Sequence, residues 1–234
     1  MRDDGDVRRD ADTATAFGAE LLVWFSSSFP TGAFAYSQGL ETAVAAGRVT
    51  GREELADWLQ ALLRHGMVWS DLVLVSLAWR SDERDAINRL ADLSVALQAS
   101  AERAEEMRVQ GRNFRDALAA GWPHAADALV DIDETTLTYP VAVGRACRAQ
   151  GLALDQTLEA YGHAFVSNAL SAAIRLSVIG QFDGQRIHAG LFAQIREAAQ
   201  AAAGAGEEDI ATAPFAADIY SMQHETLKVR LFRS

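Results

Sequence analysis

The chain has 234 residues, of which 50% are hydrophobic and 23% charged, and its formal net charge is -11. This length and apolar fraction suffice for one globular domain with a sizeable core. So acidic a surface repels phosphate backbones, which excludes nucleic acid as an expected partner. The single cysteine, Cys147, excludes an internal disulfide and is typical of a small buried hydrophobe.

The first residues do not indicate a targeting segment. Residues 1–15 mix both charges and lack an apolar run, so they predict a disordered tail rather than a signal peptide. The longest apolar stretch, residues 67–79, is too short to cross a bilayer and carries Asp71. We therefore expect a soluble, cytoplasmic protein with no membrane partner.

The hydrophobic spacing predicts an all-α fold, a single-domain helical bundle over residues 16–203. A linker over residues 204–214 and a C-terminal tail over residues 215–234 follow it. The helices predicted in chain order cover residues 16–28, 33–46, 54–65, 67–80, 82–98, 101–120, a segment that starts near residue 140, and then residues 155–180 and 186–203.

Several residues predict how these helices begin and end. Gly47 suits the left-handed position after a helix, and Pro140 suits a first turn, where its missing N–H costs nothing. Thr50 and Glu53 have the spacing of a capping box, and Asp155 is expected to cap the helix that follows it. The charges along residues 101–120 indicate a solvated face.

The segment 155–180 is apolar on most sides, so we expect it at the centre of the bundle. Its two apolar stripes are Tyr161, Phe165, Ala172, Leu176 and Val166, Leu170, Ile174, Val178. Asn168 and Arg175 are polar exceptions. Because an unpaired buried charge is costly, Arg175 must reach a carboxylate, extend to the surface or face a partner.

No catalytic or metal motif is evident. The five histidines lie far apart in sequence, and none forms a pair at ligand spacing, so no preformed high-affinity metal site is predicted; they are His65, His124, His163, His188 and His224. A P-loop is also missing, so we expect no nucleotide hydrolysis and no enzyme activity. The alternative is an all-helical, Mg²⁺-dependent phosphate-processing enzyme that uses Asp131, Asp133 and Glu134, although solvated loop acids are the better interpretation.

Four stretches, in order, resemble the urease accessory protein UreF family. They are SSFPTGAFAYSQGLETAVAAG at residues 27–47, EMRVQGRNF at 106–114, TYPVAVGRACRAQG at 138–151 continuing in SNALSAAIRLSVIGQFDGQRI at 167–187, and DIYSMQHETLKVRLFRS at 218–234. The resemblance implies a homodimeric assembly chaperone for nickel insertion into apo-urease. Such proteins bridge a second accessory protein, UreD (also called UreH), and the GTPase UreG, whose activity they modulate. No cofactor of its own is implied: nickel is in transit and GTP binds the partner.

The resemblance also implies partner-binding residues. Glu41 and Arg175 match positions implicated in urease activation, so we expect them to act functionally rather than to support the core. Thr138 stands where the family often has His, which weakens the idea of a nickel relay there, and LKVRLFRS replaces the usual YSRLFRS ending. The tail is expected to dock onto UreD with Phe232 as its anchor. The remaining implied residues are Tyr36, Ser37 and Gln38 near Glu41; Gln181, Asp183, Gln185 and Arg186 in a loop; and Lys228, Arg230, Leu231, Arg233 and Ser234 in the tail.

Overall fold

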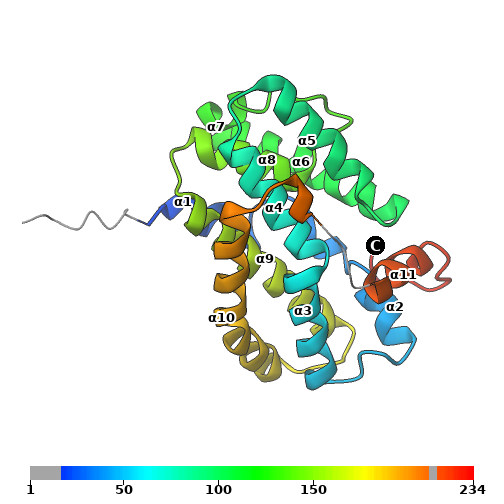
Figure 1. The fold of residues 1–234 in the computed structure, drawn as a ribbon. Helices are drawn as coiled ribbons and strands as arrows, with labels where there is room; N and C mark the ends of the chain where they lie inside the picture. The colour runs from blue at the N-terminus through cyan, green and yellow to red at the C-terminus, as the bar shows by residue number, and fades with distance from the viewer. Residues whose placement is uncertain (1–16, 211–214) are drawn as a thin grey trace, which may run out of the picture.

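The computed structural model describes residues 17–210 and 215–234. Within them the chain forms one all-α bundle without a β-strand, which confirms the predicted fold class (Figure 1). The predicted disordered tail, residues 1–15, and the last four residues of the predicted linker lie outside the described residues.

The bundle consists of α-helices and two short 3₁₀ segments. Their bounds are α1 (Ala19–Trp24), η1 (Ala33–Ala35), α2 (Leu40–Ala45), α3 (Arg52–His65), α4 (Met67–Arg80), α5 (Arg84–Ala96), α6 (Ala101–Gly121), α7 (Pro123–Asp127), α8 (Tyr139–Ala149), α9 (Leu154–Arg175), α10 (Gln181–Gly204), η2 (Glu207–Asp209) and α11 (Phe215–His224).

Helix α4 crosses the middle of the molecule, with α5 to α8 on one side of it in Figure 1 and α3, α9 and α10 on the other. Ten of its 14 residues are buried. Gly144 lets α8 lie against it, since a Cβ there would be only 2.4 Å from the Val75 carbonyl oxygen. Helix α9, which we expected at the centre, packs on α4 and α10 and shares the core rather than forming its axis.

The predicted helix over residues 33–46 is broken. Gln38 has a φ of 58° and Gly39 a φ of 82°, both left-handed, so the chain turns out of η1 before α2 begins. Gly39 could carry no side chain, because a Cβ there would lie 2.9 Å from the Ser221 main-chain nitrogen on α11. The break therefore allows α11 to pack closely on α2, as Figure 1 also shows.

The predicted helix ends are partly confirmed. Gly47 has a φ of 69° and Pro140 lies in the first turn of α8, both as expected. The capping box at Thr50 is wrong, because α3 begins after Gly51 without a side-chain cap. Asp155 lies inside the first turn of α9 rather than at its cap, where its charge still favours the helix N-terminus.

Residues 52–80 are long and apolar enough in composition to resemble a membrane span. Gly66 divides them into α3 and α4, and 72% of the most apolar window is buried inside the protein. This burial is typical of core helices in a globular protein.

Candidate functional site

The last residues of the chain are held against the break between η1 and α2. The main-chain oxygen of Ser234 accepts hydrogen bonds from the amides of Ser37 and Gln38, at 2.8 and 3.0 Å, and from the Ser37 hydroxyl at 2.5 Å. The Arg233 amide donates to the Ala35 carbonyl at 2.9 Å. The left-handed turn supplies these donors, since a continuous helix would have used the same amides internally.

Glu41 completes this contact from the first turn of α2. Its two carboxylate oxygens accept the amides of Leu231, at 2.7 Å, and Phe232, at 3.1 Å. The buried His224 on α11 lies between two acids, with Nε2 3.2 Å from Glu41 and Nδ1 2.6 Å from Glu102. We call Ser37, Gln38 and Glu41, together with residues 231–234, the tail clamp.

Arg175 reaches the tail clamp from the end of α9. Its guanidinium lies over the Phe232 ring, with Cζ 4.2 Å from the centroid, and donates to the Phe34 carbonyl oxygen. Its side chain is exposed. Of the three expected outcomes, it extends to the surface, and its contacts in the described part of the chain include no carboxylate. Phe232 is only 4% exposed, and the tail therefore lies on this protein's own body.

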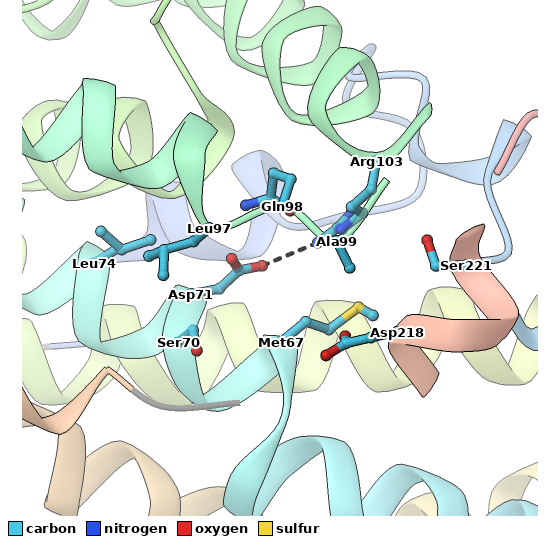
Figure 2. Close-up of a pocket in the computed structure, with 10 residues that line it drawn as sticks. All are labelled: Met67, Ser70, Asp71, Leu74, Leu97, Gln98, Ala99, Arg103, Asp218 and Ser221. Carbon is cyan, nitrogen blue, oxygen red and sulfur yellow. Dashed lines mark hydrogen bonds and ion pairs between the residues drawn. The ribbon is translucent and has the colours of Figure 1, made fainter. Parts of the chain in front are cut away.

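Beneath the tail clamp, Arg103 joins two acids in the core. Its guanidinium lies 3.2 Å from Asp71 on α4 and 2.5 Å from Glu106 one turn along α6. Figure 2 shows Asp71 and Arg103 pointing toward each other. The Tyr161 hydroxyl donates to Asp71 at 3.0 Å. We call Asp71, Arg103 and Glu106 the buried ion cluster; Arg103 is 2% exposed and Glu106 0%, which contradicts the solvated face predicted for this part of α6.

Glu106 of the buried ion cluster also contacts two residues of the tail clamp, Gln38 and Ser234. Its oxygens accept hydrogen bonds from the side chains of Gln38, at 3.0 Å, Gln110, at 2.9 Å, and Ser234, at 2.7 Å. Burial raises the pKa of Asp71 to about 6, even though Arg103 opposes the rise. Glu106, a carboxylate in the core, thus holds the end of the chain directly through the Ser234 hydroxyl.

The space around the buried ion cluster is too small for a substrate. The cavity drawn in Figure 2 has a volume of about 20 Å³, and one on the side of Tyr139 and Tyr161 about 50 Å³. The first has room for roughly one water molecule. A surface groove of about 510 Å³ runs beside the tail, and its lining residues include Tyr36, Glu102, Glu105, Arg230 and Arg233. Burial raises the pKa of Tyr36 in this groove.

The other partner-binding residues that the resemblance implies lie at two places, the tail and the start of α10. Arg230 pairs with Glu102, while Lys228, Val229 and Leu231 are exposed on the outer side of the tail. Gln181, Asp183, Gln185 and Arg186 form the first turns of α10 rather than a loop, and Asp183 pairs with Arg186 at 2.9 Å. In Figure 1 the start of α10 lies apart from α11 and the tail, so these residues form a separate surface.

The three acids proposed as Mg²⁺ ligands each interact with a different partner. Asp131 pairs with Arg84 at 3.2 Å and Glu134 with Arg115 at 2.8 Å. Asp133 accepts the amide and hydroxyl of Thr135, both at 2.7 Å, and these bonds lower its pKa. Since the three acids do not converge, their geometry gives the Mg²⁺-dependent enzyme no support.

One pair of histidines in contact was not predicted from the sequence. His163 on α9 and His188 on α10 lie with Nδ1 and Nε2 3.0 Å apart. The described part of the chain holds no group of three or more His, Cys, Asp or Glu side chains placed to bind a metal ion. Thr138 is fully buried and donates to the Ser94 hydroxyl at 2.8 Å, so a small hydroxyl fills the position where the resemblance has histidine.

Comparison with known proteins decides the family. The UreF family model matches residues 49–192, more than half of the chain. The chain belongs to the UreF family. It is 43% identical over 225 residues to the urease accessory protein UreF of Agrobacterium fabrum, covering 96% of this chain and 99% of that protein. The protein of the same name from Roseobacter denitrificans is 42% identical over 214 residues, 92% of each chain.

The buried ion cluster lies within the part of the chain that the UreF family model matches. Asp71, Arg103 and Glu106 all fall within residues 49–192, whereas Glu41 and the tail lie outside that span. No direct signal in the sequence joined Asp71 to Arg103. Asp71 in an otherwise apolar run does require a buried cationic or hydrogen-bonding partner, and that requirement was the available hint.

Proposed function

We propose that this protein is an accessory chaperone of urease assembly without turnover of its own. It would bridge a UreD/UreH-type protein and a UreG-type GTPase while nickel enters apo-urease, and would modulate that GTPase. We further propose that it works as a cytoplasmic homodimer and that nickel passes without a tightly held cofactor site. The similarity to urease accessory proteins over 96% of the chain is the observation that carries this proposal.

The outer side of the tail supports UreD docking. Val229 is 86% exposed and Leu231 54%, and Ile219 and Met222 on α11 are also exposed. A partner that covers these exposed apolar side chains would remove them from water, which favours association. The Phe232 ring already packs against Arg175, and its amide is bound by Glu41. We therefore assign the anchoring role to Val229 and Leu231 instead, with Lys228 beside them.

The buried part of the tail then acts as the support for this surface. Glu41 and the amides of Ser37 and Gln38 fix the path of residues 231–234, so the exposed side chains are presented in one conformation. A surface held in advance loses less conformational entropy when a partner binds. Glu41 and Arg175 would thus affect urease activation through the position of the tail.

The test is a double substitution, Val229→Asp with Leu231→Asp, in cells that express the complete set of urease genes. We expect loss of co-purification with UreD and loss of urease activity, with an unchanged melting temperature. Val130→Asp is the matched control, since Val130 is 71% exposed in the turn after α7. UreD retained by the double variant at wild-type level would refute docking through this surface. Unimpaired urease activation in a strain that lacks the protein altogether would refute the assembly role itself.

A further inference from the structure

The ring of His224 lies between two carboxylates at the C-terminal end of α11. Nδ1 is 2.6 Å from Glu102 on α6, and Nε2 is 3.2 Å from Glu41 on α2. The side chain is fully buried, so these two contacts decide how its nitrogens are satisfied. Three helices that are far apart in the sequence therefore meet at one imidazole, beside the tail clamp.

Both contacts require the ring to carry two protons. An ionised carboxylate only accepts hydrogen bonds, so each ring nitrogen that faces one must donate. A neutral imidazole has a single N–H, and its other nitrogen would point a lone pair at a carboxylate oxygen. The geometry around His224 is therefore complete only when the ring is an imidazolium.

The other contacts of the two acids favour their ionised forms. Glu41 accepts two main-chain amides of the tail, and Glu102 forms an ion pair with Arg230. Donors of this kind stabilise a carboxylate rather than a neutral carboxyl group. Two negative charges then face two positive ones, and a neutral ring would remove one of these positive charges from a buried place.

Further charged groups near the ring have partners of their own. Glu225, next to His224, accepts the Ala101 amide at 2.8 Å, and Glu106 on α6 pairs with Arg103. His224 also stands in the last turn of α11, where the unpaired main-chain carbonyl groups favour a positive charge. The surroundings of the ring thus support its charged form from several directions.

We propose that His224 is a positioning residue, charged while the tail is docked, and that it couples proton binding to the docking of residues 231–234. The imidazolium fixes the Glu41 carboxylate, whose two oxygens hold the tail amides. Proton binding and docking then strengthen each other, as thermodynamic linkage requires. Docking is strongest while the ring is charged, and it weakens as the pH rises through the titration of the ring. This coupling concerns the chain's own tail and does not rest on the proposed assembly role.

Nitrogen-15 NMR of the histidine rings in the full-length protein tests the charge. At pH 6, both ring nitrogens of His224 should carry a proton and show a scalar coupling to it. The exposed ring of His65, in the same spectra, serves as the solvated reference. One bare nitrogen on His224 at pH 6 would overturn the proposal.

Hydrogen exchange of the Leu231 and Phe232 amides from pH 5.5 to pH 9 tests the coupling. Each measured rate is compared with the rate of an unstructured peptide at the same pH, which leaves the protection due to docking. We expect this protection to fall about tenfold or more as the ring loses its proton, a size typical of losing hydrogen bonds to a charged group. Constant protection over this range would overturn the proposal.

Glu102→Gln separates the charge from the packing, because it leaves the buried ring in place. The glutamine amide can donate to a neutral Nδ1 and still accept from Arg230, so protection should change less than about twofold with pH. Glu105→Gln is the matched control on the same helix: its side chain is 59% exposed, so the wild-type pH profile should remain. A tenfold change retained by Glu102→Gln, or lost in Glu105→Gln, would overturn the proposal. Circular dichroism at pH 7 establishes that both variants are folded.

Discussion

Replacing Arg103 by Met should destabilise the protein strongly. The side chain is 2% exposed and lies between Asp71 and Glu106, so its loss leaves two buried carboxylates without their cation. Breaking a buried pair in this way costs about 3–5 kcal/mol. For a chain of this size, that loss corresponds to a fall in melting temperature of roughly 6–20 °C.

The loss should also depend on pH. Burial raises the pKa of Asp71 to about 6 in the folded protein, so the folded state retains a proton that the unfolded state releases. Stability therefore falls as pH rises from the ordinary carboxyl pKa toward 6. Arg103 opposes the rise in this pKa, so Arg103→Met should push it above 6. The decline in stability then extends to higher pH, and the variant should lose more relative to the wild type at pH 8 than at pH 5.

Urea unfolding followed by circular dichroism at both pH values is the assay. Arg108→Met is the matched control on the same helix, because Arg108 makes a partly exposed ion pair with Glu105 at 3.6 Å. Such a pair contributes about 0–1 kcal/mol, so the control should unfold nearly as the wild type does. Equal losses for the two variants, or a smaller loss for Arg103→Met at pH 8 than at pH 5, would refute the reasoning.

Three further predictions concern the tail clamp and the core. Glu41→Ala removes the acceptor of the Leu231 and Phe232 amides, about 1.5–3 kcal/mol for each charge-assisted bond, so trypsin should cleave the tail faster than in the wild type. An unchanged cleavage rate would contradict the tail clamp. Arg175→Ala removes an exposed cation–π contact of about 0.5–1 kcal/mol and should barely change the melting temperature; a large fall would instead assign Arg175 to the core. Burial raises the pKa of Cys147 to about 12, so iodoacetamide at pH 8 should alkylate it only after denaturation, which mass spectrometry would measure.

The fold class was predictable because the signals for helices are local. Apolar residues at helical spacing, Gly47 after α2 and Pro140 in α8 all act within a few residues of the chain. The break before α2 was not predictable in the same way. Its sequence is compatible with a helix, and the close approach of Ser221 to Gly39 comes from packing between segments far apart in sequence.

The candidate site was predictable only in part, for a related reason. The resemblance pointed to Glu41, Arg175 and the tail, and the structure brings them together in one contact. It gave no indication that Phe232 is buried, because that depends on the fit of the tail to its own bundle. The pair of Asp71 and Arg103 is separated by 32 positions and exists only once α4 and α6 share a core. The charges along α6 gave no sign of this ion pair, since the buried face of the helix carries charged as well as apolar side chains.

The contact between Ser37 and Ser234 spans 197 positions, so it imposes an order on biosynthesis. Residues 231–234 leave the ribosome after every group that they contact. Until then, Glu41 and Glu106 must keep water in place of the tail amides and the Ser234 hydroxyl. Contacts between residues so far apart in sequence form late, because closing the intervening loop costs conformational entropy before the contact stabilises it. The surface offered by the tail can therefore form only after residues 231–234 have been made and have reached Ser37, Glu41 and Glu106.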